Sequence, residues 1–256
     1  MAHMKIYPTD LEIGPSNGGF GLWLNGKLLL TASGAPVEHV AMPLLEHMVS
    51  EFDGQGTISV VKGKIVAPKF FGAFALYSIQ KQFIELGKDE LTQDFEARLL
   101  HDPVLHPVAG PEQIDQRIRW ESLDRWLGPD LEGLRGYTED RLRDLPDEIA
   151  TATPTKIIAQ LKSCYLALSP EQRTVVMFLY ALHQGSVLFP LVLVLGKCTE
   201  PEYAQGVMAS YAMLTGVFGD VQHKDHRRLF DELRAHARTA LDYIQYYRKG
   251  TQPKTH

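Results

Sequence analysis

The chain has 256 residues, a formal net charge of -5, and a composition that is 45% hydrophobic and 22% charged. This length can bury a sizeable core, and the hydrophobic share is that of a globular protein and not of a disordered chain. The acidic balance argues against a nucleic-acid binder, which usually presents a basic face. No secretory signal peptide is expected, because the first ten residues contain no apolar core.

The N-terminal third carries the sequence signals of two hairpins with a helix between them. Apolar segments 20–24 and 27–31 flank Asn25-Gly26, a pair suited to a type I′ turn because both positions need a positive φ. A second hairpin is predicted around Lys62-Gly63, over residues 57–66. Apolar residues recur at helical spacing over 37–52, which predicts the inserted helix.

The rest of the chain is predicted to be helical. Helical segments are expected at 70–86, 111–127, 153–168, 199–213 and 229–249, whereas 131–145 has a weaker apolar stripe and suits a partial loop. The fold class is therefore α+β, with a small β-rich N-terminal domain that carries an inserted helix, followed by an all-helical C-terminal domain. We place these domains at 1–95 and 96–256.

Residues 174–196 form an uncharged stretch long enough to cross a bilayer or to be the buried central helix of a helical domain. The buried helix is favoured over the membrane span, because polar residues 183–186 lie in its middle. Ser169-Pro170-Glu171-Gln172 is typical of a helix start in a water-soluble domain, with a capping serine and a glutamine at the capping-box position. Pro190 is expected to kink or end the helix.

Motifs for cofactor chemistry are weak. The glycine-rich segment 14–21 lacks the Gly-Lys-Ser/Thr of a phosphate loop and precedes a strand, so no nucleotide site is predicted. Cys164 and Cys198 lie far apart, in no metal-type spacing, and are expected to be reduced thiols in a reducing compartment. No cofactor is predicted.

Histidines provide the remaining candidates for chemistry. His223 and His226 lie one helical turn apart and could chelate a metal. A metal site needs a third and usually a fourth ligand, for which Asp220 and His236 are no more than possible donors. A solvated helix start capped by Asp220 is favoured over a metal site. His183 and Ser186 lack the strand-turn-helix context of a nucleophile, so a satisfied polar patch inside the bundle is the preferred interpretation. The chain is predicted not to be an enzyme.

Five segments follow one another along the chain in a distinctive order. They are an opening hairpin at 20–36, a helix ending in Glu-Phe-x-x-Gln at 51–56, a Pro-Glu…Trp…Trp helix at 111–126, a Gly-Ser core segment at 182–188 and an aromatic-Gly-Asp turn at 218–220. Their order resembles that of a chaperone family that holds the free alpha subunit of the F-type ATP synthase before its catalytic head assembles. This correspondence covers about residues 19–245.

The chain departs from the pattern of this family in its acidic cluster. Phe218 replaces the usual tryptophan, and Asp220 alone keeps the negative charge between Gly216 and Gln222. The segment that follows is basic, with His223, Lys224, Arg227 and Arg228. The resemblance implies a partner-binding site at Phe218, Gly219, Asp220 and His223.

The resemblance implies a non-enzymatic chaperone that shields the apolar interface of the free ATP synthase alpha subunit until the beta subunit binds. The alternative is a structural accessory subunit of a mitochondrial respiratory or ATP synthase complex that has kept the chaperone fold. Both imply a protein partner, no nucleic acid and no membrane span. The implied compartment is the mitochondrial matrix, or the cytoplasm of a bacterium.

Overall fold

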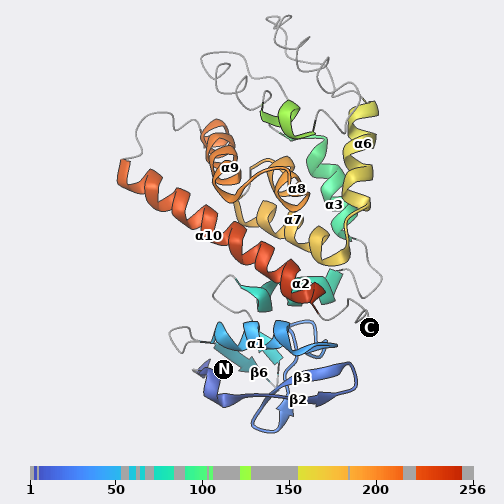
Figure 1. The fold of residues 1–256 in the computed structure, drawn as a ribbon, viewed down its shortest axis with the longest axis vertical. Coiled ribbons are helices and arrows are strands. Elements are labelled where there is room, and N and C mark those ends of the chain that lie inside the picture. The colour runs from blue at the N-terminus through green and yellow to red at the C-terminus, as the bar shows by residue number, and fades with distance from the viewer. Residues whose placement is uncertain are drawn as a thin grey trace, which may run out of the picture. The chain divides into compact units, whose positions relative to one another are not determined.

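The computed structural model confirms the α+β class, with a small antiparallel sheet followed by a mainly helical part (Figure 1). It describes residues 3–4, 6–52, 58–61, 64–66, 72–83, 90–102, 104–105, 122–127, 155–183, 185–215 and 223–249. Two compact units are present: 1–89 with 239–256, and 90–238. The domain boundary at residue 95 stays a prediction, from which these units differ chiefly by joining residues 239–256 to the N-terminal part.

A four-stranded antiparallel sheet forms the centre of the first unit. Strands β2 (Leu11–Ser16), β3 (Gly19–Leu24) and β4 (Lys27–Leu28) follow in that order, and β5 (Glu38–His39) also pairs with β3. The short 3-10 helix η1 (Pro8–Asp10) leads into β2. Asn25 and Gly26 have φ values of 51° and 70°, so the hairpin turn with two positive φ angles is confirmed.

The second predicted hairpin is also confirmed. Strands β6 (Ile58–Val61) and β7 (Lys64–Val66) pair with Val61 opposite Lys64, which leaves Lys62-Gly63 as the connection. The short strand β1 (His3–Met4) adds to β6, giving a separate three-stranded sheet.

The inserted helix is shorter than predicted. Helix α1 spans Met42–Ser50, not 37–52, because residues 38–39 pair with β3 as β5. Val37 and Phe52 are fully buried, so they fit the apolar stripe, but they reach the core from outside the helix. Pro43 lies in the first turn, where a missing N–H costs little. Helix α1 packs on the sheet (Figure 1).

Buried tyrosine hydroxyls connect helices of the first unit to a strand and to one another. Helix α2 (Ala73–Phe83) lies within the predicted 70–86 helix, and the hydroxyl of its Tyr77 donates to the Glu38 carbonyl at 2.6 Å. The C-terminal part of α10 (His223–Arg248) belongs to the same unit, and Tyr243 donates to Oε1 of Gln80 on α2 at 2.6 Å.

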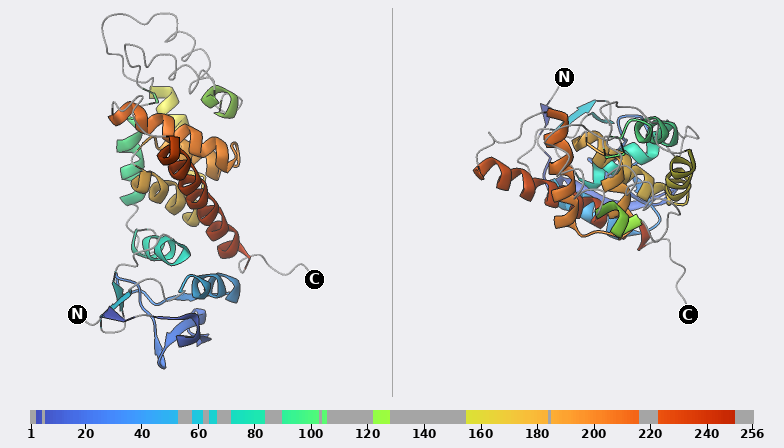
Figure 2. Two further views of the ribbon diagram at one scale, coloured as in Figure 1. Left: turned by 90° about the vertical axis from the view of Figure 1, so that its left-hand side faces the viewer. Right: turned by 90° about the horizontal axis from the view of Figure 1, so that it is seen from above.

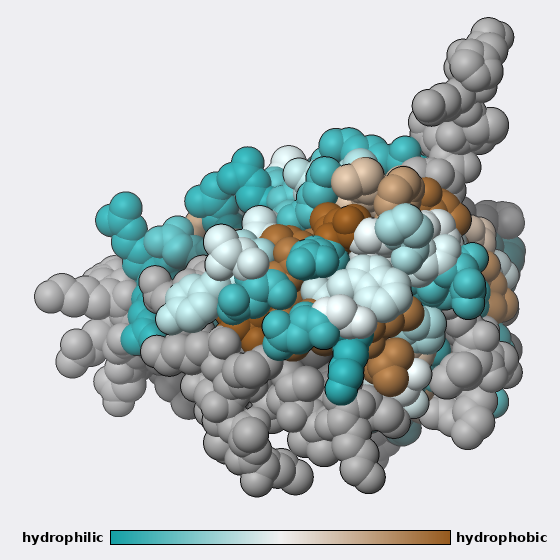
Figure 3. Space-filling model, turned by 90° about the horizontal axis from the view of Figure 1, so that it is seen from below, coloured by the Kyte–Doolittle hydropathy of each residue, from teal (hydrophilic) through white to brown (hydrophobic). Residues whose placement is uncertain are grey.

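Apolar and polar residues are interspersed on the face of the molecule seen in Figure 3.

Helices make up the described part of the second unit. They are α3 (Glu90–Leu99), a short helix at 122–127, α6 (Thr155–Leu166), α7 (Pro170–His183), α8 (Leu188–Val194), α9 (Glu200–Thr215) and the first part of α10. Helix α7 packs on α8, and α8 on α9 (Figure 2). Of the predicted 111–127 helix only 122–127 is described, and 131–145 lies outside the described residues.

The uncharged stretch forms two helices, as expected, but Pro190 does not divide them. Helix α7 ends at His183 and α8 begins at Leu188, so the break falls at 184–187. Pro190 is in the first turn of α8, where helical N–H groups have no intrahelical acceptor, so it is tolerated. All residues of α8 are buried. Among the described helices, none combines the length and the apolar character that a bilayer crossing requires.

The capping box predicted at Ser169–Gln172 is confirmed, and a second one opens α9. Gln172 Oε1 accepts from the backbone N–H of Ser169 at 3.1 Å and from its hydroxyl at 3.0 Å. At the start of α9, Glu202 Oε2 accepts from the Thr199 N–H at 2.9 Å, and Thr199 Oγ1 accepts from the Glu202 N–H at 3.4 Å. These side chains satisfy helix N-terminal donors that otherwise lack acceptors.

Helices α8 and α9 approach closely at Gly206. A Cβ atom at this position would lie 2.3 Å from Cε1 of the buried Phe189 ring. We expect Gly206→Ala to lower the free energy of unfolding by about 1–3 kcal/mol, because overpacking outweighs the better helix propensity of alanine. Urea denaturation checks this, with the exposed neighbour Gln205→Ala as control. A stabilised Gly206→Ala variant would show that the helices separate without cost.

Candidate partner-binding site

The four residues predicted to bind a partner lie around the connection between α9 and α10. His223 is the first residue of α10, whereas Phe218, Gly219 and Asp220 fall outside the described residues. Helix α9 ends at Thr215. Their role in partner binding stays a prediction, and the described helices on either side of them supply the structural context.

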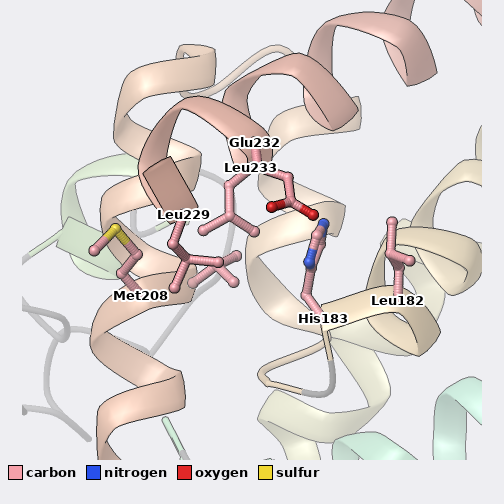
Figure 4. Close-up of a pocket in the computed structure, with 7 residues that line it drawn as sticks. Leu182, His183, Met208, Leu229, Glu232 and Leu233 are labelled. Atoms are coloured by element: carbon pink, nitrogen blue, oxygen red, sulfur yellow. The ribbon is translucent and has the colours of Figure 1, made fainter. Parts of the chain in front are cut away.

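These two helices, together with the end of α7, line an open pocket of about 260 Å³ (Figure 4). Its lining residues are Leu182 and His183 of α7, Val207 and Met208 of α9, and Leu229, Glu232 and Leu233 of α10. Leu182 is 41% exposed, so an apolar side chain borders the opening. A methionine in the wall adds a flexible, polarisable surface that adapts to different contacts.

Two polar side chains interrupt this apolar lining. The Glu232 side chain is exposed, while Nε2 of His183 is buried and has no hydrogen-bond partner. In Figure 4 the Glu232 carboxylate and the His183 ring point toward one another across the pocket. A buried polar atom without a partner is unfavourable, so a turn of the His183 ring that brings Nε2 to the pocket would let an occupant satisfy it.

The electrostatics of the pocket are set by two histidines in contact. The rings of His183 and His236 stack with centroids 5.2 Å apart, and Tyr203 meets His183 edge-on at 6.4 Å. Burial, and secondarily the neighbouring His236, lower the pKa of His183 to about 4. Burial also lowers the pKa of His236, against the opposing charge of Glu232. Both rings are therefore neutral near pH 7, and Glu232 is the charged group of the lining.

The histidines do not form a metal site in the described part of the chain. His183 and His236 stack face to face with 26° between their planes, so their nitrogens do not converge on one point. His226 lies exposed on α10. No group of three or more His, Cys, Asp or Glu side chains suited to a metal ion occurs among the residues that the structure describes.

The prediction of a satisfied polar patch is confirmed for Ser186 but is wrong for His183, whose Nε2 has no hydrogen-bond partner among the described residues. The Ser186 hydroxyl donates to Oδ2 of Asp102 at 2.8 Å, and the same oxygen accepts from the Val187 N–H at 2.8 Å. The other oxygen, Oδ1, accepts from the Val104 N–H at 3.0 Å. Asp102 is 2% exposed, so this carboxylate is a buried cap that fixes the start of α8.

Sequence reasoning missed a comparable anchor in the first unit. Glu51 follows α1, and its carboxylate accepts from the backbone N–H groups of Ala73 at 2.6 Å and Phe74 at 3.2 Å. It therefore caps the N-terminus of α2, which also favours its negative charge. No local sequence pattern predicts this role, because Glu51 and the helix that it caps are far apart in the sequence.

Two tyrosines near the end of α10 contact histidines of the first unit. The ring of Tyr246 stacks on His47 with centroids 4.5 Å apart, and the ring centroid of Tyr247 lies 4.7 Å from that of His39. The Lys249 ammonium group lies over the Tyr246 ring, 4.6 Å from its centroid. Packing within the first unit accounts for these two tyrosines.

Comparison with known proteins supports the fold. No protein-family model matches the sequence, and no curated protein matches it. Among solved structures, the crystal structure of Atp12 from Paracoccus denitrificans is similar, with a TM-score of 0.64 and 13% sequence identity over 96% of this chain and 98% of that chain. A single-substitution variant of the same protein is similar with a TM-score of 0.63 and 14% sequence identity, again over 96% of this chain and 98% of that chain. The chain therefore has the fold of Atp12 along almost its whole length.

Proposed function

We propose that this protein is a non-enzymatic assembly chaperone of the ATP synthase. The observation that carries the proposal is the fold match to Atp12, because it spans nearly all of both chains and includes the β-rich and helical parts. The ordered sequence segments that resemble the chaperone family support it independently. The match is one of fold, and the activity is our inference from it.

The finer proposal is that the client is the free ATP synthase alpha subunit. Such a subunit exposes apolar surface that the beta subunit covers in the assembled head, and exposed apolar patches promote aggregation. A chaperone that binds this surface lowers the concentration of the aggregating species by mass action. It has to bind more weakly than the beta subunit so that it is released. No ATP hydrolysis is needed for this cycle.

We propose that Phe218, Gly219, Asp220 and His223 contact the client. Asp220 is the acidic residue that this chain keeps within the segment, so it is the group to test. The compartment we propose is the mitochondrial matrix, or the bacterial cytoplasm if the source is a bacterium.

We expect Asp220→Asn to weaken binding of purified alpha subunit about tenfold, the usual effect of losing one hydrogen bond to a charged group. Binding is measured by biolayer interferometry with the immobilised chaperone. Glu12→Gln, which removes an exposed carboxylate from β2, is the matched control and should bind like the wild type. Equal affinities for all three proteins would move the site away from Asp220, and no binding by the wild type would contradict the client.

A permanent accessory subunit is the second candidate. The basic segment after the turn favours it, since His226, Arg227 and Arg228 are exposed on α10 where the family pattern has acidic residues nearby. Native-gel separation of the source extract distinguishes the two. Migration at low mass with free alpha subunit supports the chaperone, whereas migration only in a large mature complex supports the structural subunit.

A further inference from the structure

We propose that the pocket between α7, α9 and α10 binds an arginine side chain of the client polypeptide. This inference rests on the proposed function only in taking the ligand to be part of a protein. It names a site that is separate from the predicted residues at 218–220 and consists of described side chains alone.

The shape and chemistry of the lining match the two parts of an arginine. Leu182, Leu229 and Leu233 offer apolar contacts for the three methylene groups of the stem. Glu232 stands at the polar side with an exposed carboxylate, to which a guanidinium can donate two parallel hydrogen bonds. A purely aliphatic side chain would leave this carboxylate unused, and an acidic one would be repelled.

His183 adds a second contact for the guanidinium. Its ring is neutral near pH 7, so it does not repel a cation, and its buried Nε2 has no hydrogen-bond partner. Once the ring turns toward the pocket, this nitrogen can accept a hydrogen bond, in the tautomer whose other nitrogen is protonated. The flat ring also suits stacking by a planar guanidinium. The Glu232 carboxylate and the neutral His183 ring together favour a positively charged hydrogen-bond donor.

Among the described residues, no cationic side chain already pairs with the Glu232 carboxylate. Arg228 precedes Glu232 by one helical turn, yet within the part of the chain that the structure describes Glu232 forms no ion pair. The pocket residues all lie in one compact unit, so its apolar lining and the exposed Glu232 are in place without a rearrangement of the backbone.

The test uses the full chain with methyl-labelled methionine, so that the Met208 methyl signal reports on the pocket. N-acetyl-arginine amide is titrated, with N-acetyl-citrulline amide as a neutral ligand of similar shape and N-acetyl-leucine amide as an apolar ligand. We expect saturable shifts with the arginine ligand and affinities about tenfold weaker with the citrulline ligand. Equal affinities for these two, tighter binding of the leucine ligand, or no shift with any of them would overturn the proposal.

Variants assign the effect to Glu232. Glu232→Gln should weaken arginine binding about tenfold, while Asp231→Asn, which removes an exposed charge beside the pocket, should leave it unchanged. Glu232→Asp keeps the charge and should retain part of the affinity, which excludes misfolding as the cause.

Binding of purified alpha subunit to the same variants separates this inference from the proposed function. If the wild type and Glu232→Gln bind the subunit equally, the arginine site fails and the chaperone function stands. If the arginine ligand binds but the alpha subunit does not, the pocket stands and the client is wrong.

Discussion

Replacing Asp102 by alanine is expected to lower the free energy of unfolding by about 3–5 kcal/mol, because the change leaves several buried donors without an acceptor. These donors are the Ser186 hydroxyl and the N–H groups of Val187 and Val104, which all bond to the Asp102 carboxylate within 3.0 Å. Urea denaturation followed by circular dichroism measures the loss. Asp102→Asn keeps the shape but provides one acceptor oxygen, so a smaller loss of about 1–3 kcal/mol is expected.

The control for Asp102 is Asp94 on α3. Its carboxylate is about half exposed and pairs with Arg98 one turn along the same helix at 3.2 Å. Surface pairs of this kind contribute little, so Asp94→Ala should change stability by about 0.5 kcal/mol or less. A similar small loss for Asp102→Ala would show that water replaces the carboxylate and that the cap is not needed.

A double-mutant cycle assigns part of the effect to one contact. Ser186→Ala removes the hydroxyl that donates to Asp102 and accepts from the Leu188 N–H at 3.1 Å. Because the two side chains are in direct contact, the losses of the single variants should not add, with a coupling energy of about 0.5–3 kcal/mol. Additive losses would mean that Asp102 acts chiefly through the backbone groups.

Features that depend on neighbouring residues in the chain were predictable from the sequence. The turn at Asn25-Gly26 follows from residues that tolerate positive φ, and the starts of α7 and α9 follow from side chains that cap their own helix. In each case the physical cause lies within four positions. The α+β class follows from the same local patterns, taken over the whole chain.

The features that could not be predicted have their cause in distant residues. The sequence placed the break of the uncharged stretch at Pro190, yet the chain leaves the helix near Ser186 because Asp102 supplies the acceptor for Val187 there. The pocket combines residues of α7, α9 and α10, and no spacing rule brings His183 next to His236. In the first unit, the apolar spacing of 37–52 suited a helix, but pairing of β5 with β3 takes residues 38–39 into the sheet.

Glu51 gives the second large expected effect, a dependence of stability on pH. Burial raises the pKa of its carboxyl to about 7, although the hydrogen bonds from Ala73 and Phe74 act in the opposite direction. The folded state therefore binds the proton more tightly than the unfolded state, whose value is near 4.5. The contribution of Glu51 is fully present below pH 4.5 and is lost as the pH rises through 7, a decrease of about 3 kcal/mol.

The variant Glu51→Gln isolates this contribution, because it stays neutral at every pH. The difference in unfolding free energy between the wild type and the variant should fall as the pH rises from 4.5 to 7 and stay constant above that range. Burial lowers the pKa of His47, which gives a slope of opposite sign. Because His47 Nε2 lies 3.8 Å from Glu51 Oε1, the same comparison is repeated in a His47→Ala background, so that the two groups are separated. Glu46→Gln, an exposed position on α1, controls for removal of a carboxylate.

The outcome decides which of two opposing effects dominates at this helix cap. The Glu51 side chain is only 13% exposed, so loss of hydration favours the protonated form, whereas the 2.6 Å bond from the Ala73 N–H and the positive end of α2 favour the carboxylate. A difference that rises with pH would mean that the cap outweighs burial and that the pKa lies below 4.5. A difference that falls with pH would mean that α2 is held most firmly when Glu51 is protonated, so the first unit loosens toward neutral pH.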